Sequence, residues 1–125
     1  MVNKKILVVD DEEDIVTLVK MRLEAEGYEV LTAFDGQQAL DMVKKEVLDL
    51  IILDLMLPKI SGYKVCRMLK FDEKYKKIPI IIFTARSHSS DKDLGMEVGA
   101  DAYLMKPFES QALLSKIKEL LAAEN

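Results

Sequence analysis

The sequence predicts an α/β domain in which a five-stranded parallel sheet is covered by helices on both faces. Short continuous apolar runs, typical of strands buried on both sides, alternate along the chain with stretches whose apolar residues recur at helical spacing. The chain has 125 residues, of which 50% are apolar and 32% are charged, as in a globular domain with its own core. We therefore expect residues 1–125 to form one domain.

Each element follows from its local pattern. Strands are expected at residues 6–9, 28–33, 50–53, 80–83 and 102–105. Helices are expected at residues 14–26, 37–45, 91–98 and 109–123, and over a stretch that carries Val65, Met68 and Leu69. The first helix has one apolar face, made of Ile15, Leu18, Val19 and Leu23. The seven methionines are scattered, and we expect them to fill the core.

Right-handed crossovers between parallel strands leave few topologies for five β-α units. The leading one is the flavodoxin-like strand order 2-1-3-4-5. In sheets of this kind a ligand binds beyond the carboxyl ends of the strands, where the strand order reverses. That point lies between the first and third strands, so the residues that follow these strands are the candidates for function.

Composition excludes several classes of function. The 18 basic and 22 acidic residues give a net charge of −4, the wrong sign for binding nucleic acid or an anionic membrane. The single cysteine, Cys66, cannot form an intrachain disulfide and is expected to be a small buried hydrophobe. The apolar run at residues 6–9 is too short for a secretion signal or a membrane span, so we expect the protein in the cytoplasm.

Charged and hydroxyl side chains stand at the carboxyl ends of four expected strands. Asp10 and Asp11 follow the first strand, Asp54 follows the third, Thr84 closes the fourth, and Lys106 follows the fifth. An acidic pair before a helix is usually a cap, so the combination of strand ends carries the prediction. Clustered carboxylates repel one another, and a hard divalent cation relieves that repulsion. The pattern predicts a Mg²⁺ site, in which Mn²⁺ can substitute.

Phosphoryl transfer to a carboxylate uses these same groups. A cation and a lysine neutralise charge on the phosphoryl oxygens, and a hydroxyl holds one of them. Asp54 stands alone at its strand end, so it suits the role of nucleophile better than the adjacent Asp10 and Asp11.

Four segments of the chain resemble the receiver domain of two-component response regulators, a CheY-like domain. They are ILVVDD at residues 6–11, LDLMLP at residues 53–58, TA at residues 84–85 and KPF at residues 106–108. The resemblance covers nearly the whole chain and keeps the family's order and spacing.

The resemblance implies roles for the strand-end residues. Asp54 corresponds to the phosphoacceptor, which takes a phosphoryl group from a histidine kinase or a phosphotransfer protein. Asp10, Asp11, Asp54 and the backbone carbonyl of Met56 correspond to the Mg²⁺ ligands. Lys106 corresponds to the phosphoryl-binding lysine. The domain is then a phosphorylation-activated switch, and it is no enzyme beyond its own phosphotransfer and slow autodephosphorylation.

The resemblance also implies how the signal reaches an output protein. Thr84 and Tyr103 correspond to a hydroxyl and an aromatic side chain that move together on phosphorylation. The surface that changes is made of the fourth helix, the fifth strand and the fifth helix, and it carries Lys92, Met96, Tyr103 and Lys116. A cis peptide bond is expected before Pro107.

Residues 54–58 and 84–86 look most like receivers of winged-helix transcription factors, the OmpR/PhoB class. Members of that class carry two acidic residues before the switch aromatic, whereas Ala102 stands at the second of these positions. An acid is also expected at position 111 or 112, where the chain has Gln111 and Ala112. We therefore expect a monomer or a weak dimer. The sequence leaves open whether the receiver acts alone or belongs to a longer regulator.

Three other functions use some of these features. A phosphatase of the haloacid dehalogenase type also forms a phosphoaspartate, but it needs Asp-x-Asp after its first strand, and Asp10 and Asp11 are adjacent. A nucleotide-binding module needs a glycine-rich loop after a strand, which this sequence lacks. A receiver that works without phosphorylation has no need of Asp54, Thr84 and Lys106 together. The phosphorylated receiver accounts for all of them.

Overall fold

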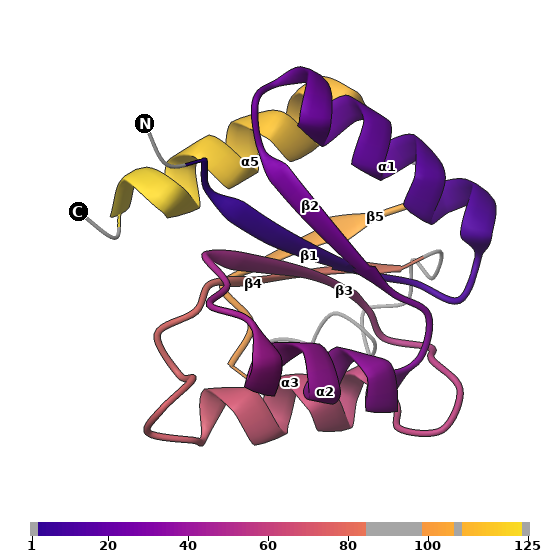
Figure 1. The fold of residues 1–125 in the computed structure, drawn as a ribbon, viewed down its shortest axis with the longest axis vertical. Helices are drawn as coiled ribbons and strands as arrows, with labels where there is room; N and C mark the ends of the chain where they lie inside the picture. Colours follow the sequence, from indigo (N-terminus) through magenta and orange to yellow (C-terminus); the bar gives the residue numbers. More distant parts are fainter. Residues whose placement is uncertain (1–2, 85–98, 107–108, 124–125) are drawn as a thin grey trace.

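The computed structural model describes residues 3–84, 99–106 and 109–123, and the structural statements below concern these residues. Five parallel strands form one sheet: β1 (Lys5–Val9), β2 (Glu29–Ala33), β3 (Leu50–Asp54), β4 (Ile80–Thr84) and β5 (Ala102–Met105). Their order is β2-β1-β3-β4-β5, as the sequence predicts (Figure 1). The described helices are α1 (Glu13–Ala25), α2 (Gly36–Lys45), α3 (Gly62–Lys70) and α5 (Ser110–Ala123). The helix expected at residues 91–98 lies outside the described residues.

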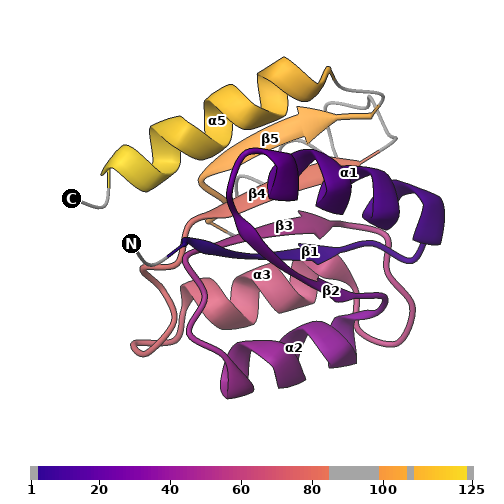
Figure 2. The ribbon, with the colours of Figure 1, turned by 45° about the horizontal axis from the view of Figure 1, so that its top comes forward.

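The sheet lies between two layers of helices. Helices α1 and α5 cover one face and α2 and α3 cover the other (Figures 1 and 2). Successive residues of β1 point to opposite faces: Ile6 and Val8 pack in the core under α1 and α5, and Leu7 and Val9 in the core under α2 and α3. Burial on both faces is why the strands are continuous apolar runs. Within the described chain, no helix combines the length and the apolarity needed to cross a bilayer.

The strand register brings the candidate residues to one edge of the sheet. Val9 pairs with Leu53 across β1 and β3, and Asp54 pairs with Phe83 across β3 and β4. The last pair of β4 and β5 joins Thr84 to Met105. Asp10, Asp54 and Lys106 therefore lie at the same carboxyl edge, around the point between β1 and β3 where the strand order reverses.

Side-chain caps fix the loops that leave this edge. The Oδ1 of Asp35 accepts a hydrogen bond from the Gln38 amide at 2.8 Å and begins α2. The Oγ of Ser61 accepts one from the Lys64 amide at 3.3 Å and begins α3. Both helices therefore start at defined residues on the side of the sheet that carries the candidate site.

Some expected core positions are wrong. Leu18 is 58% exposed and Met68 is 49% exposed, whereas Val16, which was not assigned to the apolar face, is buried. The buried side of α1 runs through Val16, Val19 and Leu23, because a helix on a sheet buries only the side that touches the strands. The methionines do not simply fill the core either, since several are about half exposed or more: Met21, Met56, Met68 and Met105.

Candidate functional site

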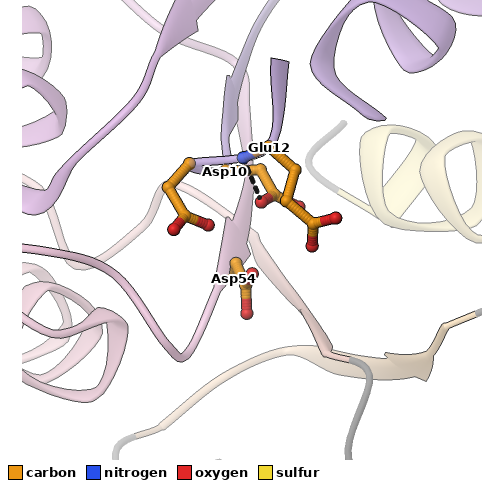
Figure 3. A group of neighbouring side chains, drawn as sticks. Asp10, Glu12 and Asp54 are labelled. Atoms are coloured by element: carbon orange, nitrogen blue, oxygen red, sulfur yellow. Dashed lines mark hydrogen bonds between the residues drawn. The ribbon is translucent and has the colours of Figure 1, made fainter. Parts of the chain in front are cut away.

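The site is built from residues at the carboxyl ends of β1, β3 and β5. Asp10 directly follows β1, Asp54 is the last residue of β3, and Lys106 directly follows β5. Figure 3 shows the side chains of Asp10 and Asp54 extending from neighbouring strands, with Glu12 beside Asp10. Asp10 is fully buried and Asp54 is 5% exposed. Two carboxylates are thus held out of water at the point where the topology places a ligand.

Four carboxyl groups meet at this edge. One carboxylate oxygen from each of Asp10, Asp11, Glu12 and Asp54 lies within 4.8 Å of the others. Asp11 and Glu12 are exposed, unlike Asp10 and Asp54. The strand-end pattern predicts that Asp10, Asp11 and Asp54 meet, but it does not point to Glu12. The signal was present, because Glu12 extends the acidic pair by one residue.

Lys106 balances part of this charge. Its Nζ donates hydrogen bonds to Asp10 Oδ2 at 2.5 Å and to Asp54 Oδ2 at 3.2 Å, and it lies 3.5 Å from Glu12 Oε1. The same Nζ sits 4.8 Å from the centre of the Phe83 ring, a contact that the sequence did not indicate. Burial alone would lower the pKa of Lys106, but the hydrogen bond to Asp10 and the charges of both aspartates raise it. The ammonium therefore stays charged.

Burial dominates the electrostatics of Asp54. It raises the pKa of this carboxyl to about 6, although the Met56 amide and the charge of Lys106 act in the opposite direction. The Met56 amide donates to Asp54 Oδ1 at 3.1 Å, while Oδ2 faces Lys106. Desolvation, followed by the hydrogen bond and the charge of the neighbouring Asp10, also raises the pKa of Asp11. One buried ammonium thus faces two buried carboxylates, and the site holds excess negative charge.

Glycine brings the loop after β3 close to Asp54. The Gly62 amide donates to the Leu55 carbonyl at 2.9 Å, and a Cβ at Gly62 would collide with the backbone carbonyl oxygen of Asp54. A Cβ at Gly36 would likewise collide with the Ile60 carbonyl of the same loop. Only a residue without a side chain permits these approaches, so the loop is pinned between α2 and α3.

The other predicted residues stand as follows. Thr84 is the last residue of β4, next to β5, and the structure describes its backbone but not its side chain. Tyr103 lies on β5 and is half-buried against the core under α2 and α3. Met56 is 50% exposed and contacts Asp54 through its backbone. Pro107 and residues 85–98, with Lys92 and Met96, lie outside the described residues.

The acidic cluster suits a hard divalent cation. Carboxylate oxygens are the protein ligands that Mg²⁺ prefers, and Mg²⁺ is commonly held by one or two carboxylates with waters and phosphate oxygens. Asp10 and Asp54 are buried with a single lysine between them, and Asp11 and Glu12 offer further oxygens from the exposed side. A bound cation would offset the excess of buried negative charge, so binding of a cation here is electrostatically favourable.

Comparison with known proteins places the chain among signalling domains. The response regulator receiver domain matches residues 6–118. The alkaline phosphatase synthesis transcriptional regulatory protein PhoP of Bacillus subtilis (strain 168) is 49% identical over 119 residues, 95% of this chain and 49% of PhoP. PhoP is of the OmpR/PhoB class, which agrees with the resemblance of the motifs. The chain spans about half the length of the curated relatives it matches.

Solved structures share the fold closely. A CheY-like response regulator receiver domain protein from Methanospirillum hungatei JF-1 has a TM-score of 0.91 and 33% identity, over 98% of this chain and 96% of that chain. The receiver domain of a sensor histidine kinase from Pseudomonas aeruginosa PAO1 has a TM-score of 0.89 and 29% identity, over 97% of this chain and 99% of that chain. That structure has a magnesium ion coordinated in its active site cleft. Together with the strand-end residues, these matches show that the chain belongs to the response regulator receiver domains, the phosphorylation-activated switches of two-component signalling.

Proposed function

We propose that residues 1–125 form one receiver domain that accepts a phosphoryl group on Asp54 from a histidine kinase or a phosphotransfer protein. The observation that carries the proposal is the contact of Lys106 Nζ with both Asp10 and Asp54 at a buried sheet edge. This geometry holds a nucleophilic carboxylate beside a fixed positive charge, as phosphoryl transfer requires.

In the proposed reaction a carboxylate oxygen of Asp54 attacks the phosphorus of a phosphohistidine. The new bond joins that oxygen to phosphorus, and the bond from phosphorus to the imidazole nitrogen breaks. Lys106 lies on the Asp54 Oδ2 side, where it neutralises charge on the equatorial phosphoryl oxygens. The Met56 amide holds Asp54 Oδ1 and fixes the carboxyl plane. The hydroxyl of Thr84 is proposed to take one phosphoryl oxygen.

Asp10, Asp11, Asp54 and the backbone carbonyl of Met56 are proposed to hold Mg²⁺, or Mn²⁺ in its place. The bound ion supplies positive charge that offsets the phosphoryl oxygens and the clustered carboxylates. Support comes from the acidic cluster and from the excess negative charge around Lys106.

The domain is a signalling protein and not a classical enzyme. We propose that its catalysis is limited to its own phosphotransfer and a slow autodephosphorylation. Asp54 is 5% exposed, which restricts the approach of water to the phosphoryl group.

The signal is proposed to leave through the surface of the fourth helix, β5 and α5. Thr84, at the end of β4, pairs with Met105 of β5. Tyr103 lies two residues before Met105 and is half-buried. A movement of Thr84 toward the phosphoryl group would change the space beside Tyr103. The output protein binds this changed surface, and direct binding of nucleic acid or membrane by this chain is not proposed, since its net charge is −4.

The phosphoryl donor is proposed to dock beside the acidic cluster. An apolar hollow of about 490 Å³ between α1 and α5 reaches Lys106, and its walls include Ile15, Leu18 and Leu114. Leu18→Ser is then expected to slow transfer from a kinase and to leave labelling by acetyl phosphate unchanged.

The proposed function is tested by mass spectrometry after incubation with acetyl phosphate and Mg²⁺. Wild type is expected to gain one phosphoryl group and Asp54→Asn none, because Asp54 is the proposed sole acceptor. Asp41→Asn, which changes an exposed carboxyl on α2, is the matched control and is expected to be labelled like wild type. Labelling retained in Asp54→Asn would refute the assignment.

A further inference from the structure

Helix α3, together with its C-cap residue Phe71, presents an exposed stripe of apolar and cationic side chains. Lys64, Arg67, Met68 and Phe71 are all exposed, with Met68 at 49% and Phe71 at 73%. Their spacing of three, one and three residues puts them on one side of the helix, away from the sheet. The opposite side packs into the core through Val65, Cys66 and Leu69. We call these four exposed residues the α3 stripe.

The α3 stripe forms a hollow and not only a row of side chains. Its four residues line a shallow concavity of about 510 Å³. The phenyl ring of Phe71 and the thioether of Met68 give it an apolar lining, to which Lys64 and Arg67 add two long cationic side chains. Two large apolar side chains this exposed, beside fixed charges, are typical of a surface that binds a protein.

The cations of the α3 stripe have no acidic partner among the described residues. No ion pair within that part of the chain uses the side chain of Lys64 or Arg67. The acids that follow α3 are engaged locally: Glu73 pairs with Lys76 at 2.9 Å, and Asp72 Oδ1 accepts from the Lys74 amide. In a chain with a net charge of −4, these two cations make this surface locally basic, and an acidic partner surface would complement it.

We propose that the α3 stripe docks an acidic amphipathic helix of a partner protein. Such a helix lays apolar side chains against Met68 and Phe71 and sets carboxylates opposite Lys64 and Arg67, which is the helix-in-groove mode of recognition. The proposal goes beyond the proposed function, because α3 is not part of the proposed output surface. Helix α3 links the two sites, since it begins at Gly62 against the Asp54 carbonyl and carries the stripe away from it toward Phe71.

The probe is a fluorescein-labelled designed helix with leucines on one side and glutamates flanking them. We expect the wild-type protein to bind it, and we expect Phe71→Ser and Arg67→Glu each to weaken binding at least about tenfold, as for central interface residues. Met21→Ser, which removes a 63% exposed methionine from α1, is the matched control and is expected to bind like wild type. Anisotropy gives the affinities, and thermal melts verify that each variant is folded.

Charge is tested separately from apolar contact. The same peptide with lysines in place of the glutamates is expected to bind at least about tenfold more weakly, and added salt is expected to weaken the glutamate peptide. Equal binding of both peptides, or unchanged binding by Arg67→Glu, would overturn the proposal. Self-association of the wild type that Phe71→Ser abolishes, without binding of the peptide, would also overturn it, because the occupant would be a second copy of this chain.

Discussion

The buried carboxyl group of Asp54 makes the free energy of unfolding depend on pH. Its pKa rises from 3.8 to about 6 through burial, so the folded protein binds more protons than the unfolded chain between these values. The free energy of unfolding therefore falls as the pH rises from about 4 to about 6. Above that range, the folded protein bears the full cost of burying an ionised Asp54 carboxylate. The attraction of Lys106 is already included in the raised pKa.

Asp54→Asn is therefore expected to stabilise the protein at neutral pH in the presence of EDTA. The gain is about 1–3 kcal/mol at pH 7.5 and disappears as the pH falls toward 4, because each pKa unit corresponds to about 1.4 kcal/mol. Urea unfolding across this pH range measures it. Asp41→Asn, at an exposed position, is expected to show no such trend. A stabilisation of Asp54→Asn that is the same at every pH would contradict the argument.

Cys66 is expected to be inert in the folded protein. It is buried in the core under α2 and α3, and burial raises the pKa of its thiol to about 12. The thiolate, which is the reactive species, is therefore scarce at pH 8. Iodoacetamide is expected to modify the native protein at least about a hundredfold more slowly than the urea-unfolded protein. Val47→Cys, at a position that is 85% exposed, is the control, and its added thiol should react rapidly in the native state.

The sequence predicts which residues meet at the strand ends, but it does not predict how deeply each of them is buried or what it contacts. The sequence predicted that Asp10, Asp11, Asp54 and Lys106 meet, because parallel strands deliver their next residues to one edge. It did not distinguish the buried Asp10 from the exposed Asp11, since that difference depends on the direction in which the chain leaves β1. The contact of the Phe83 ring with Lys106 depends on the register of β4 and β5, which no local pattern encodes.

At the scale of elements, the strands were predicted better than the helix faces. A strand buried on both sides shows an uninterrupted apolar run, so β1 and β3 were found to within one residue at each end. The sequence also predicts α1, but it places Leu18 on the buried side, which is wrong because Leu18 is 58% exposed. The apolar stripe of a helix shows which of its sides is hydrophobic. Only the packing of the folded protein decides whether that side contacts the sheet or stays exposed.

Gly62 at the start of α3 is expected to resist substitution. In Gly62→Ala the new Cβ would meet the Asp54 carbonyl oxygen and Leu55 Cα, both backbone atoms that can move only with β3. We expect a loss of about 3 kcal/mol, within the range for overpacked sites, and slower phosphorylation by acetyl phosphate. Urea unfolding and mass spectrometry measure the two effects.

Gly27→Ala is the matched control for this substitution. Its Cβ would meet no atom within 4 Å, and the cost comes only from the backbone angle φ of 93°. We expect about 1 kcal/mol of destabilisation, with phosphorylation unchanged. If Gly27→Ala slowed phosphorylation as much as Gly62→Ala, the effect would be a general loss of stability and not a displaced acceptor loop.

At the scale of the whole molecule, Mg²⁺ is expected to stabilise the fold. A ligand that binds only the folded state adds about 2.7 kcal/mol at a hundredfold excess over its dissociation constant. Asp11→Asn should lose most of this gain, and Asp14→Asn, whose exposed carboxyl lies outside the four-acid cluster, should keep it. Thermal melts with Mg²⁺ and with EDTA measure the difference. A melting temperature indifferent to Mg²⁺ would count against the site.

Charged residues that could join two copies already form ion pairs within one copy. Asp101 Oδ2 lies 2.6 Å from Lys70 Nζ and accepts the Ile80 amide at 2.8 Å, so this acid holds the start of β5 to the end of α3. Lys116 pairs with Glu119 at 3.0 Å on α5. Asp101 and Lys116 are charged residues that could pair between two copies, and Ala102 stands where a further acid is expected.

We therefore expect beryllofluoride, which mimics the phosphoryl group, to cause weak dimerisation or none. Forming the dimer would require breaking the internal pairs of Asp101 and Lys116, and exposed ion pairs return less than about 1 kcal/mol each. Light scattering with and without beryllofluoride measures the mass, and Ala102→Asp is expected to strengthen any dimer by restoring an acid. A tight dimer of the wild type would show that apolar contacts on this surface suffice without the charged ones.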